Sequence, residues 1–329
     1  MISRRQFLKL SVMLPLLKLP TSPNICLIMA DDFCRNDLGC YANSLAHTPN
    51  IDTLASQGMR FLNAYAPCPK CSPTRWCLMT GRGMEQAHTL GNDSIILSQD
   101  RPTIAEWLKT QGYATAIVGK WGINNDHSDA GNHPNNCGFD RFFGFWDHGE
   151  AAQYYPLYIW QNGQKVPNTR YVLDLLIEDA LGWISQASQP FFLYFPTPAV
   201  HANNDLASAG LNGFSETSIN PIYANLDWPE TEKHFASLIT RMDNDIGRII
   251  SALPQNTITF FCSDNGPTPW GGHDINFLSS WDYRGTKDFV WEGGIRVPLI
   301  VHWPGWIQPG ISEHPCLISD IYATLRDIL

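Results

Sequence analysis

Short apolar runs alternate with longer amphipathic segments along this chain. The apolar runs predict buried strands at residues 25–29, 114–118, 191–195, 257–262 and 298–302. Segments with helical spacing predict helices at residues 48–59, 73–79, 104–111, 171–187, 230–253 and 319–329. Because strands alternate with helices, we expect an α/β fold, in which a mostly parallel central sheet carries helices on both faces.

Two stretches, residues 124–168 and 196–229, interrupt this alternation and are rich in Gly, Asn, Pro and aromatic residues. Loops of this length in a compact α/β domain are usually functional or disordered. We expect them to be irregular and to wall a substrate pocket. Trp146, Trp160 and Trp270 fall in predicted pocket loops, but because most tryptophans simply pack, they do not by themselves indicate a carbohydrate substrate.

The composition limits the size of the core and the kind of partner. The chain has 329 residues, 44% of them hydrophobic, which is enough for one large core or two smaller ones. Its net charge of -9 argues against a nucleic-acid partner, because such surfaces rely on broad basic patches. An anion must therefore be recognised locally, by a few cations inside a pocket. The nine cysteines allow many pairings, so the sequence assigns no disulfide, and it assigns no oligomeric state.

Polar side chains directly follow two of the predicted strands. Asp31 and Asp32 come after the run at 25–29, and Asp264 and Asn265 come after the run at 257–262. Ligands of open α/β sheets bind outside the carboxyl ends of the strands, so we expect these side chains to meet in one crevice. Carboxylate and amide oxygens favour a hard divalent cation, either calcium or magnesium.

The pentapeptide Cys71-Ser72-Pro73-Thr74-Arg75 places a thiol two residues before a proline and four before a guanidinium. Proline is favoured at the first position of a helix, and the N-terminus of a helix attracts negative charge. We therefore predict that a helix begins just after Cys71 and that the site performs covalent chemistry on an anion. Cys71 is expected in the same crevice as the strand-end carboxylates.

At these residues the chain resembles the formylglycine-dependent sulfatases, arylsulfatase-like members of the alkaline phosphatase superfamily. The likeness covers an ordered series of motifs: Pro23-Asn24-Ile25 to Asp31-Asp32, Thr48-Pro49-Asn50-Ile51-Asp52, Cys71 through Gly81-Arg82, Gly119-Lys120-Trp121, Ser263-Asp264-Asn265-Gly266 and Glu292-Gly293-Gly294-Ile295-Arg296-Val297-Pro298. The resemblance implies hydrolysis of an aryl or carbohydrate sulfate ester to an alcohol and inorganic sulfate.

The resemblance also implies that Cys71 is oxidised to formylglycine by a formylglycine-generating enzyme. The hydrated aldehyde would carry two hydroxyls, one that attacks sulfur and one that later expels sulfate. Asp31, Asp32, Asp264 and Asn265 match the family's calcium ligands, with the modified Cys71 and the substrate completing the shell. Calcium is the expected ion and magnesium the alternative, since both prefer oxygen.

Four further residues match family positions that act on the anion. Arg75, Lys120 and Lys287 are the expected charge-neutralising cations, the last from the segment Arg284-Gly285-Thr286-Lys287. His201 follows the predicted strand at 191–195 and resembles the histidine that contacts the substrate and protonates the leaving oxygen.

The chain departs from the family at Gly122. A histidine commonly follows Gly-Lys-Trp there and is thought to act as base when sulfate is released. His127 lies five residues later and could substitute if the loop folds back; otherwise release is slow or another base acts. Residues 319–325 resemble the last element of the family's large domain, so we expect the family's smaller C-terminal subdomain to be missing from this chain.

Two other functions stay open. Hydrolysis of a phosphate or phosphonate ester is one, because related metal-dependent hydrolases share the fold. Two-metal phosphoryl transfer needs a second set of His and Asp ligands, and none is evident in the sequence. Binding without turnover is the other, motivated by Gly122 and by the subdomain without a counterpart.

The N-terminus resembles an export signal. Ser3-Arg4-Arg5-Gln6-Phe7-Leu8-Lys9 fits the twin-arginine pattern, and an apolar stretch over residues 10–17 follows. We expect residues 1–22 to direct export to a bacterial periplasm and residues 23–329 to form the catalytic domain. The stretch is too short to span a bilayer, so no stable membrane insertion is expected. The alternative is a short arm packed on the domain, because Lys18 interrupts the run and no clear cleavage site follows.

Overall fold

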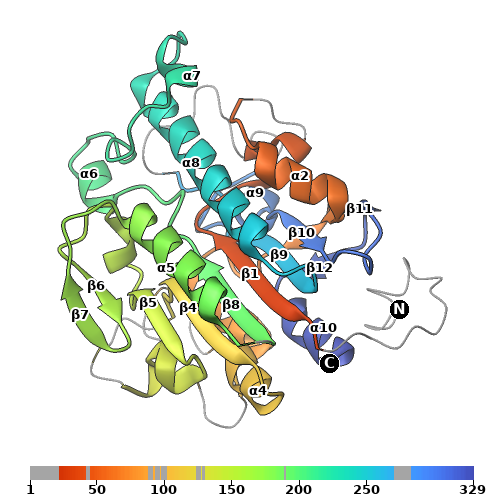
Figure 1. The fold of residues 1–329 in the computed structure, drawn as a ribbon. Helices are drawn as coiled ribbons and strands as arrows, with labels where there is room; N and C mark the ends of the chain where they lie inside the picture. The colour runs from red at the N-terminus through yellow and green to blue at the C-terminus, as the bar shows by residue number, and fades with distance from the viewer. Residues whose placement is uncertain are drawn as a thin grey trace.

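A computed structural model describes residues 22–41, 45–87, 92, 97, 102–123, 127, 130–188, 190–269 and 283–329 (Figure 1). A ten-stranded sheet runs through the molecule. From one edge to the other its strands are β11 (Gly310–Ser312), β2 (Met59–Phe61), β10 (Leu299–His302), β9 (Thr257–Ser263), β1 (Asn24–Ala30), β8 (Phe191–Pro196), β4 (Ala114–Lys120), β5 (Arg141–Phe145), β6 (Tyr158–Gln161) and β7 (Gln164–Pro167). Two short strands, β3 (Ala64–Tyr65) and β12 (Cys316–Leu317), pair separately.

The centre of the sheet is parallel. β9, β1, β8, β4 and β5 run in the same direction, while β10 and β6 are antiparallel to the strands that they flank. The pairing of β1 with β9 sets Ala30 opposite Ser263, so these two strands end side by side. The carboxyl ends of the central strands therefore lie on the same side of the molecule, where ligands bind in folds of this class.

Helices cover both faces of the sheet. One face packs against α2 (Pro49–Gln57), α5 (Val172–Gln186) and α8 (Glu230–Ala252), which lie in front of the strands in Figure 1. The other face packs against α3 (Cys71–Thr80), α4 (Ile104–Thr110) and α10 (Asp320–Ile328). Short helices α6 (Asn204–Ser208), α7 (Pro221–Ala224) and α9 (Glu292–Ile295) lie in the connections.

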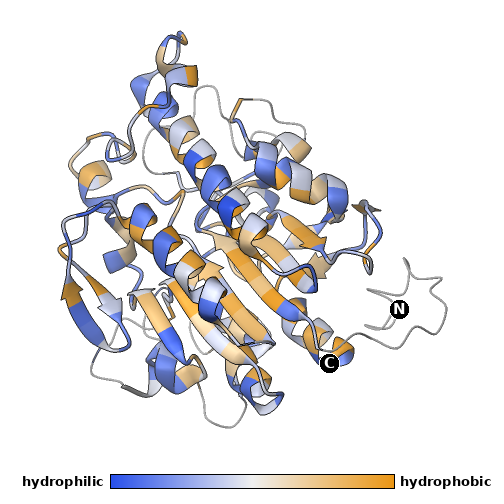
Figure 2. Cartoon of the chain, in the orientation of Figure 1, coloured by the Kyte–Doolittle hydropathy of each residue, from blue (hydrophilic) through white to orange (hydrophobic). Residues whose placement is uncertain are grey.

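β1 shows how the two helical layers create two cores. Its even-numbered residues, from Cys26 to Ala30, pack with the α2, α5 and α8 side, and its odd-numbered residues, from Ile25 to Met29, pack with the α3, α4 and α10 side. Successive side chains of a strand point to opposite faces, so a strand covered on both faces must be apolar throughout. Figure 2 shows these continuously hydrophobic central strands beside helices whose outer sides carry hydrophilic residues.

The predicted α/β fold is confirmed, and each predicted strand and helix is present with its ends within two residues of the prediction. One shift matters for the site: α3 begins at Cys71, whereas the sequence predicted a start at Pro73. Thr74 N donates to Lys70 O at 3.3 Å and closes the first turn. Pro73 fits inside that turn because the first backbone N–H groups of a helix have no partner within it.

The prediction that residues 124–168 are irregular is wrong, since β5, β6 and β7 lie there. The misleading signal was the high content of Gly, Asn and Pro, which includes Gly144 in the middle of β5. A Cβ at this position would lie 1.9 Å from the carbonyl oxygen of Gly119 in β4, so the close approach of the two strands requires glycine. The stretch 196–229 is mostly loop, as predicted, but it also contains α6 and α7.

Within the part of the chain that the structure describes, no helix combines the length and the apolarity needed to cross a membrane. Residues 1–21 of the predicted export signal lie outside the described residues.

Candidate active site

Four polar side chains meet at the carboxyl ends of β1 and β9. Asp31 and Asp32 follow β1, and Asp264 and Asn265 follow β9. Asp32 N donates to Asp264 Oδ1 at 3.1 Å, and Asn265 Nδ2 donates to Asp32 Oδ1 at 2.7 Å. Each of the four is at most 2% exposed. The paired ends of two neighbouring strands thus bury three carboxylates and an amide at one point.

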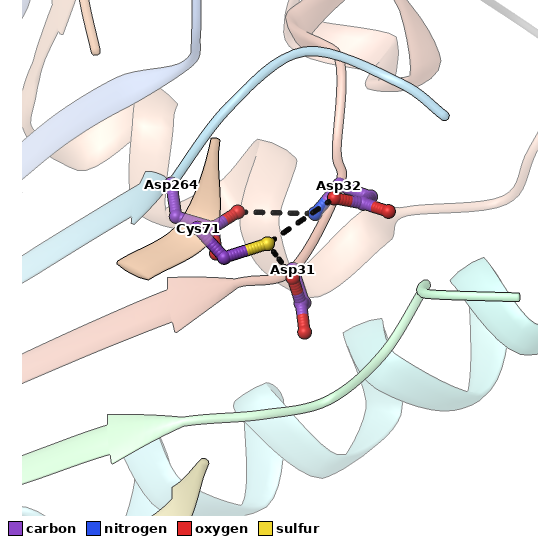
Figure 3. A group of neighbouring side chains, drawn as sticks. All are labelled: Asp31, Asp32, Cys71 and Asp264. Atoms are coloured by element: carbon purple, nitrogen blue, oxygen red, sulfur yellow. Dashed lines mark hydrogen bonds between the residues drawn. The ribbon is translucent and has the colours of Figure 1, made fainter. Parts of the chain in front are cut away.

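Cys71, the first residue of α3, reaches the same point (Figure 3). Its Sγ lies 3.5 Å from Asp31 Oδ1 and 3.8 Å from Asp32 Oδ1. Burial raises the pKa of the Cys71 thiol well above its ordinary value, although Lys120 and Lys287 lower it. The unmodified side chain is therefore a protonated thiol at neutral pH, and a thiol is a poor nucleophile.

Arg75 lies one turn further along α3 and is 0% exposed. Its Nε and Nη2 both donate to Asp264 Oδ2, at 3.0 and 2.7 Å, and its Nη1 donates to Lys120 O at 2.7 Å. Arg75 therefore ties α3 to the ends of β9 and β4 and fixes the position of Cys71.

Two lysines bring further positive charge to the carboxylates. Lys120, the last residue of β4, donates from Nζ to Asp31 Oδ2 at 2.5 Å. Lys287 Nζ lies 2.7 Å from Asp32 Oδ1 and 2.8 Å from Asp32 Oδ2. The backbone N–H of Lys287 donates to Pro267 O at 2.9 Å, which holds this loop beside the segment that follows β9.

His201 enters from the segment after β8. Its Nε2 lies 3.3 Å from Asp32 Oδ2 and 3.2 Å from Lys287 Nζ, and its Nδ1 lies 2.6 Å from Ala202 O. A carbonyl oxygen only accepts, so Nδ1 carries the proton and Nε2 is free to accept from Lys287. Burial lowers the pKa of His201, although Asp32 opposes the change. The ring is thus a neutral acceptor in this arrangement.

We call these nine residues the site cluster: Asp31, Asp32, Cys71, Arg75, Lys120, His201, Asp264, Asn265 and Lys287. Its three carboxylates are matched by three cations, but not evenly. Burial would raise the pKa of Asp31, yet Lys120, His201 and Arg75 lower it far below its ordinary value. For Asp264, burial and the charge of Asp31 raise the pKa to about 6, although Arg75 opposes them. The cations of the site cluster therefore stabilise ionised Asp31 much more strongly than ionised Asp264.

The site cluster fits a hard divalent cation. Asp31, Asp32, Cys71 and Asp264 place potential ligand atoms within 4.8 Å of one another. Among the described residues, Asn265 Oδ1 is buried without a hydrogen-bond partner, whereas buried polar atoms nearly always have one. A cation would accept electron density from this oxygen and would stabilise the ionised form of Asp264, which burial disfavours. Because the donors are mainly carboxylate and amide oxygens, calcium and magnesium fit better than a thiolate-seeking metal.

The structure does not bring every proposed residue to this site. His127 Nε2 lies 2.9 Å from Asp147 Oδ2, and its ring packs against Trp146 and Trp160. None of these contacts is with the site cluster, so the suggestion that His127 replaces the histidine missing at Gly122 gains no support. Trp146 and Trp160 are themselves buried, and Trp270 lies outside the described residues.

Sequence reasoning also overlooked a positioning residue, Ser263. Its Oγ accepts from Phe33 N and donates to Asn265 O, both at 3.0 Å, and so holds together the turns that follow β1 and β9. The available signal was its place at the start of Ser263-Asp264-Asn265-Gly266.

Comparisons with known proteins agree with the family that the sequence motifs resemble. The family model described as Sulfatase matches residues 23–329. The chain is 33% identical over 332 residues to an arylsulfatase from Hemicentrotus pulcherrimus, with 93% of this chain and 58% of that protein covered. It is 29% identical over 383 residues to an N-acetylgalactosamine-6-O-sulfatase from Bacteroides thetaiotaomicron, with 93% and 72% covered. The chain spans 58% to 64% of the first curated relatives that it matches.

Solved structures extend the likeness to the fold. The crystal structure of Ps i-CgsB matches with a TM-score of 0.78 at 29% identity, covering 94% of this chain and 72% of that one. Its complex with k-i-k-neocarrahexaose matches with a TM-score of 0.77 at 28% identity and the same coverage. A phosphonate monoester hydrolase of Agrobacterium radiobacter, 19% identical, shares the fold with a TM-score of 0.65, over 93% of this chain and 73% of that one.

Proposed function

This chain belongs to the sulfatase family, and from that premise we propose that it hydrolyses a sulfate monoester to an alcohol and inorganic sulfate. The observation that carries the proposal is the placement of Cys71, 1% exposed at the start of α3, among three carboxylates and three cations. Relatives named as arylsulfatase and N-acetylgalactosamine-6-sulfatase support an aryl or carbohydrate sulfate as the substrate.

We propose that Cys71 is oxidised to formylglycine by a maturation enzyme of the cell. The hydrated aldehyde supplies two hydroxyls, one for attack on sulfur and one for release of sulfate. The raised pKa of the Cys71 thiol supports this proposal, because the buried cysteine would be a protonated, weak nucleophile at neutral pH.

Asp31, Asp32, Asp264 and Asn265 would hold a divalent cation, for which we propose calcium, with magnesium as the alternative. When bound, the ion polarises sulfate oxygens and lowers the pKa of the attacking hydroxyl. An ion beside Asp31 and Asp32 would compete with Lys120 and Lys287 for the carboxylate oxygens that these lysines now contact. The two ammonium groups would then be available to bind the sulfate anion.

The leaving oxygen needs a proton as the sulfur–oxygen bond breaks. Lys287 Nζ and His201 Nε2 lie 3.2 Å apart, and both lie beside Asp32. We propose that this pair protonates the leaving group, with Ala202 O fixing the orientation of the His201 ring through Nδ1. Arg75 keeps its bonds to Asp264 and Lys120 throughout and acts as a positioning residue for α3.

Hydrolysis of a phosphate or phosphonate ester is the alternative activity. Two-metal phosphoryl transfer places its ions about 3.5–4 Å apart, which requires adjoining ligand sets. Among the described residues, the second group of potential ligands, His127, Asp147 and Glu150, shares no residue with the site cluster. One ion and one nucleophile, the arrangement for sulfate, is therefore the better-supported proposal.

An assay with matched substrates tests the proposed activity. We expect the protein to release product from an aryl sulfate in the presence of calcium, and Cys71→Ala to abolish release. Cys77→Ala is the control, because Cys77 is a second buried cysteine of α3 that packs in the apolar core; it should keep the activity per folded molecule. Faster cleavage of the matching aryl phosphate would favour the alternative. No cleavage of either ester by formylglycine-containing protein would favour binding without turnover.

We also propose that the protein is exported to a bacterial periplasm, on the strength of the segment Ser3 to Lys9. A reporter fused to residues 1–22 should appear in the periplasm of a bacterium with twin-arginine transport. Replacing Arg4 and Arg5 with lysines should retain the reporter in the cytoplasm. Unchanged export of that variant would contradict the twin-arginine proposal.

A further inference from the structure

Four of the five central parallel strands supply residues of the site cluster at or just after their carboxyl ends. β1 leads to Asp31 and Asp32, β9 to Asp264 and Asn265, β8 to His201, and β4 ends on Lys120. Each of these four strands thus supplies the site cluster. β5 is the fifth parallel strand, and the segment that leaves it carries His148, three residues after the strand ends at Phe145.

Backbone hydrogen bonds hold this segment beside the end of β4. β4 and β5 pair as far as Lys120 and Phe145. Beyond that pair, Trp121 N donates to Phe145 O at 2.9 Å and Gly122 N donates to Trp146 O at 3.0 Å. The two chains therefore continue side by side past the sheet, and His148 follows two residues after the last of these contacts.

The turn that carries His148 is fixed by Glu150. Asp147 Oδ1 accepts from Glu150 N at 2.7 Å, which closes the turn around His148. The Glu150 carboxylate accepts from Trp160 Nε1 at 2.8 Å and from Tyr158 OH at 2.6 Å, both on β6. Contacts to β6 therefore hold in place the turn that carries the half-buried His148.

Gly122 leaves the neighbouring position without a side chain. A Cβ there would lie 3.1 Å from Lys120 Cε and 3.5 Å from Arg75 Cδ, so it would point at the site cluster. Its φ of +63° lies in the left-handed region, which disfavours any residue with a Cβ. A proton acceptor on this side of the site must therefore come from another segment.

The charges around His148 favour a neutral ring. Burial and the positive charges of Lys120 and Lys287 lower the pKa of His148 to about 4, against the opposing effect of Asp147 and Asp31. At neutral pH the imidazole can therefore accept a proton. An anion bound beside the two lysines would offset their charge and make the ring a stronger acceptor, so the base would be strengthened when substrate is present.

Resting on the proposed function, we infer that His148 is the general base for sulfate release. His148 takes the proton from the hydroxyl that remains on residue 71 once the sulfate has been transferred to it. The electron pair of that O–H bond becomes the second bond of the carbonyl. The bond from the same carbon to the sulfate oxygen breaks, and its electron pair leaves with sulfate. The imidazolium then returns its proton to solvent.

The variant that tests this is His148→Gln, which keeps a polar side chain but cannot take up a proton at neutral pH. Removing a general base typically costs about 10²–10⁴-fold in rate. We expect the initial burst of released alcohol to persist, while the steady rate of sulfate release falls by about that factor. His127→Gln is the control from the same region, since His127 also contacts Asp147, and it should leave both phases unchanged. A steady rate unaffected by His148→Gln, or an equal loss in burst and steady rate, would overturn the assignment.

A second measurement does not depend on turnover. In the unmodified protein, the imidazole carbon signals of His148 are followed by NMR across a pH series, with and without inorganic sulfate. We expect a pKa near 4 that rises when sulfate saturates the site. Sulfate binding should therefore strengthen in wild type as the pH falls, and His148→Gln should lack this gain. An imidazole that does not respond to saturating sulfate would overturn the assignment. If wild-type protein releases no alcohol while this response is present, the proposed function fails and the location of His148 at an anion site stands.

Discussion

Replacing Asp264 with asparagine separates metal binding from folding. Asp264 Oδ2 accepts two hydrogen bonds from Arg75, and Oδ1 accepts one from Asp32 N. Asparagine has the same shape but carries no charge and has a single acceptor oxygen. If that oxygen faces Arg75, the new NH₂ group faces the N–H of Asp32, and one hydrogen bond is lost.

For the metal-free protein, two effects of this change oppose each other. The pKa of Asp264 rises from 3.8 to about 6 on folding, so the ionised side chain costs about 3 kcal/mol at 1.36 kcal/mol per pKa unit. The neutral amide of the Asp264→Asn variant would avoid this cost but would leave a buried donor unpaired, at about 1–3 kcal/mol. We therefore expect the free energy of unfolding of Asp264→Asn without metal to stay within about 2 kcal/mol of wild type.

With calcium the variant and the wild type should differ clearly. A calcium concentration of 100 times the wild-type Kd stabilises the folded state by about 2.7 kcal/mol. Loss of a residue that merely supports a metal ligand weakens affinity about 10–100-fold, and loss of a charged ligand should reach at least the upper end. At about 100-fold weaker affinity, the same calcium stabilises the variant by only about 0.4 kcal/mol.

Thermal unfolding of the unmodified protein at neutral pH, with and without calcium, measures this difference. We expect calcium to raise the melting temperature of wild type by several degrees and that of Asp264→Asn by about one degree or less. Asp243→Asn is the matched control: its buried carboxylate accepts bonds from the backbone of Asn50 and Ile51 at α2, away from the site cluster. It should melt lower but keep the calcium shift. A full calcium shift in Asp264→Asn would refute the role of Asp264 as a ligand.

Three other predictions follow from the same geometry. Arg75→Lys keeps the charge but loses most of the hydrogen bonds that the guanidinium donates to Asp264 and Lys120 O. The free energy of unfolding, measured by chemical denaturation, should therefore fall by about 3 kcal/mol. An unchanged free energy would show that Arg75 does not hold α3 to these strands. Gly122→His should destabilise the protein by about 1–2 kcal/mol, because φ is +63° there, and should not raise the steady rate of sulfate release; a faster steady rate would show that the backbone accepts the side chain. The pKa of His148 falls from 6.5 unfolded to about 4 folded, so this group binds more protons in the unfolded state and its contribution to stability is lost as the pH falls from about 6.5 to about 4. Asp264, whose pKa is raised to about 6, acts in the opposite direction. The measurement is therefore the difference between the two proteins in urea titrations: the stability of His148→Gln relative to wild type should rise as the pH falls through this range.

The sequence was most informative where one pattern had one physical cause. The apolar runs that became β1 and β9 could only be strands covered on both faces, and their carboxyl ends placed Asp31 and Asp264 together. The sequence of motifs then brought Cys71, Arg75 and the lysines to the same crevice. Strand direction and side-chain chemistry were enough to place the strand-end carboxylates together, whereas the roles of Arg75, Lys120 and Lys287 came from the resemblance to the sulfatase motifs.

The remainder depended on contacts between distant segments. β5 was predicted to be loop because its stretch of the chain is rich in Gly, Asn and Pro. One of these glycines, Gly144, is explained by the close approach of Gly119 in β4. Because β5 was not predicted, His148 was not recognised as a residue that follows a parallel strand. The start of α3 at Cys71, likewise, is set by a turn that closes onto Lys70 O, a detail that the position of Pro73 does not specify.

The mass of one peptide tests the central claim most directly. Trypsin cleaves after Lys70 and Arg75, so digestion of protein made in its native host releases Cys71–Arg75 as a single peptide. The account predicts that active protein yields this peptide with an aldehyde or its hydrate at residue 71 in place of the thiol. A uniformly unmodified cysteine in protein that still releases sulfate would contradict it.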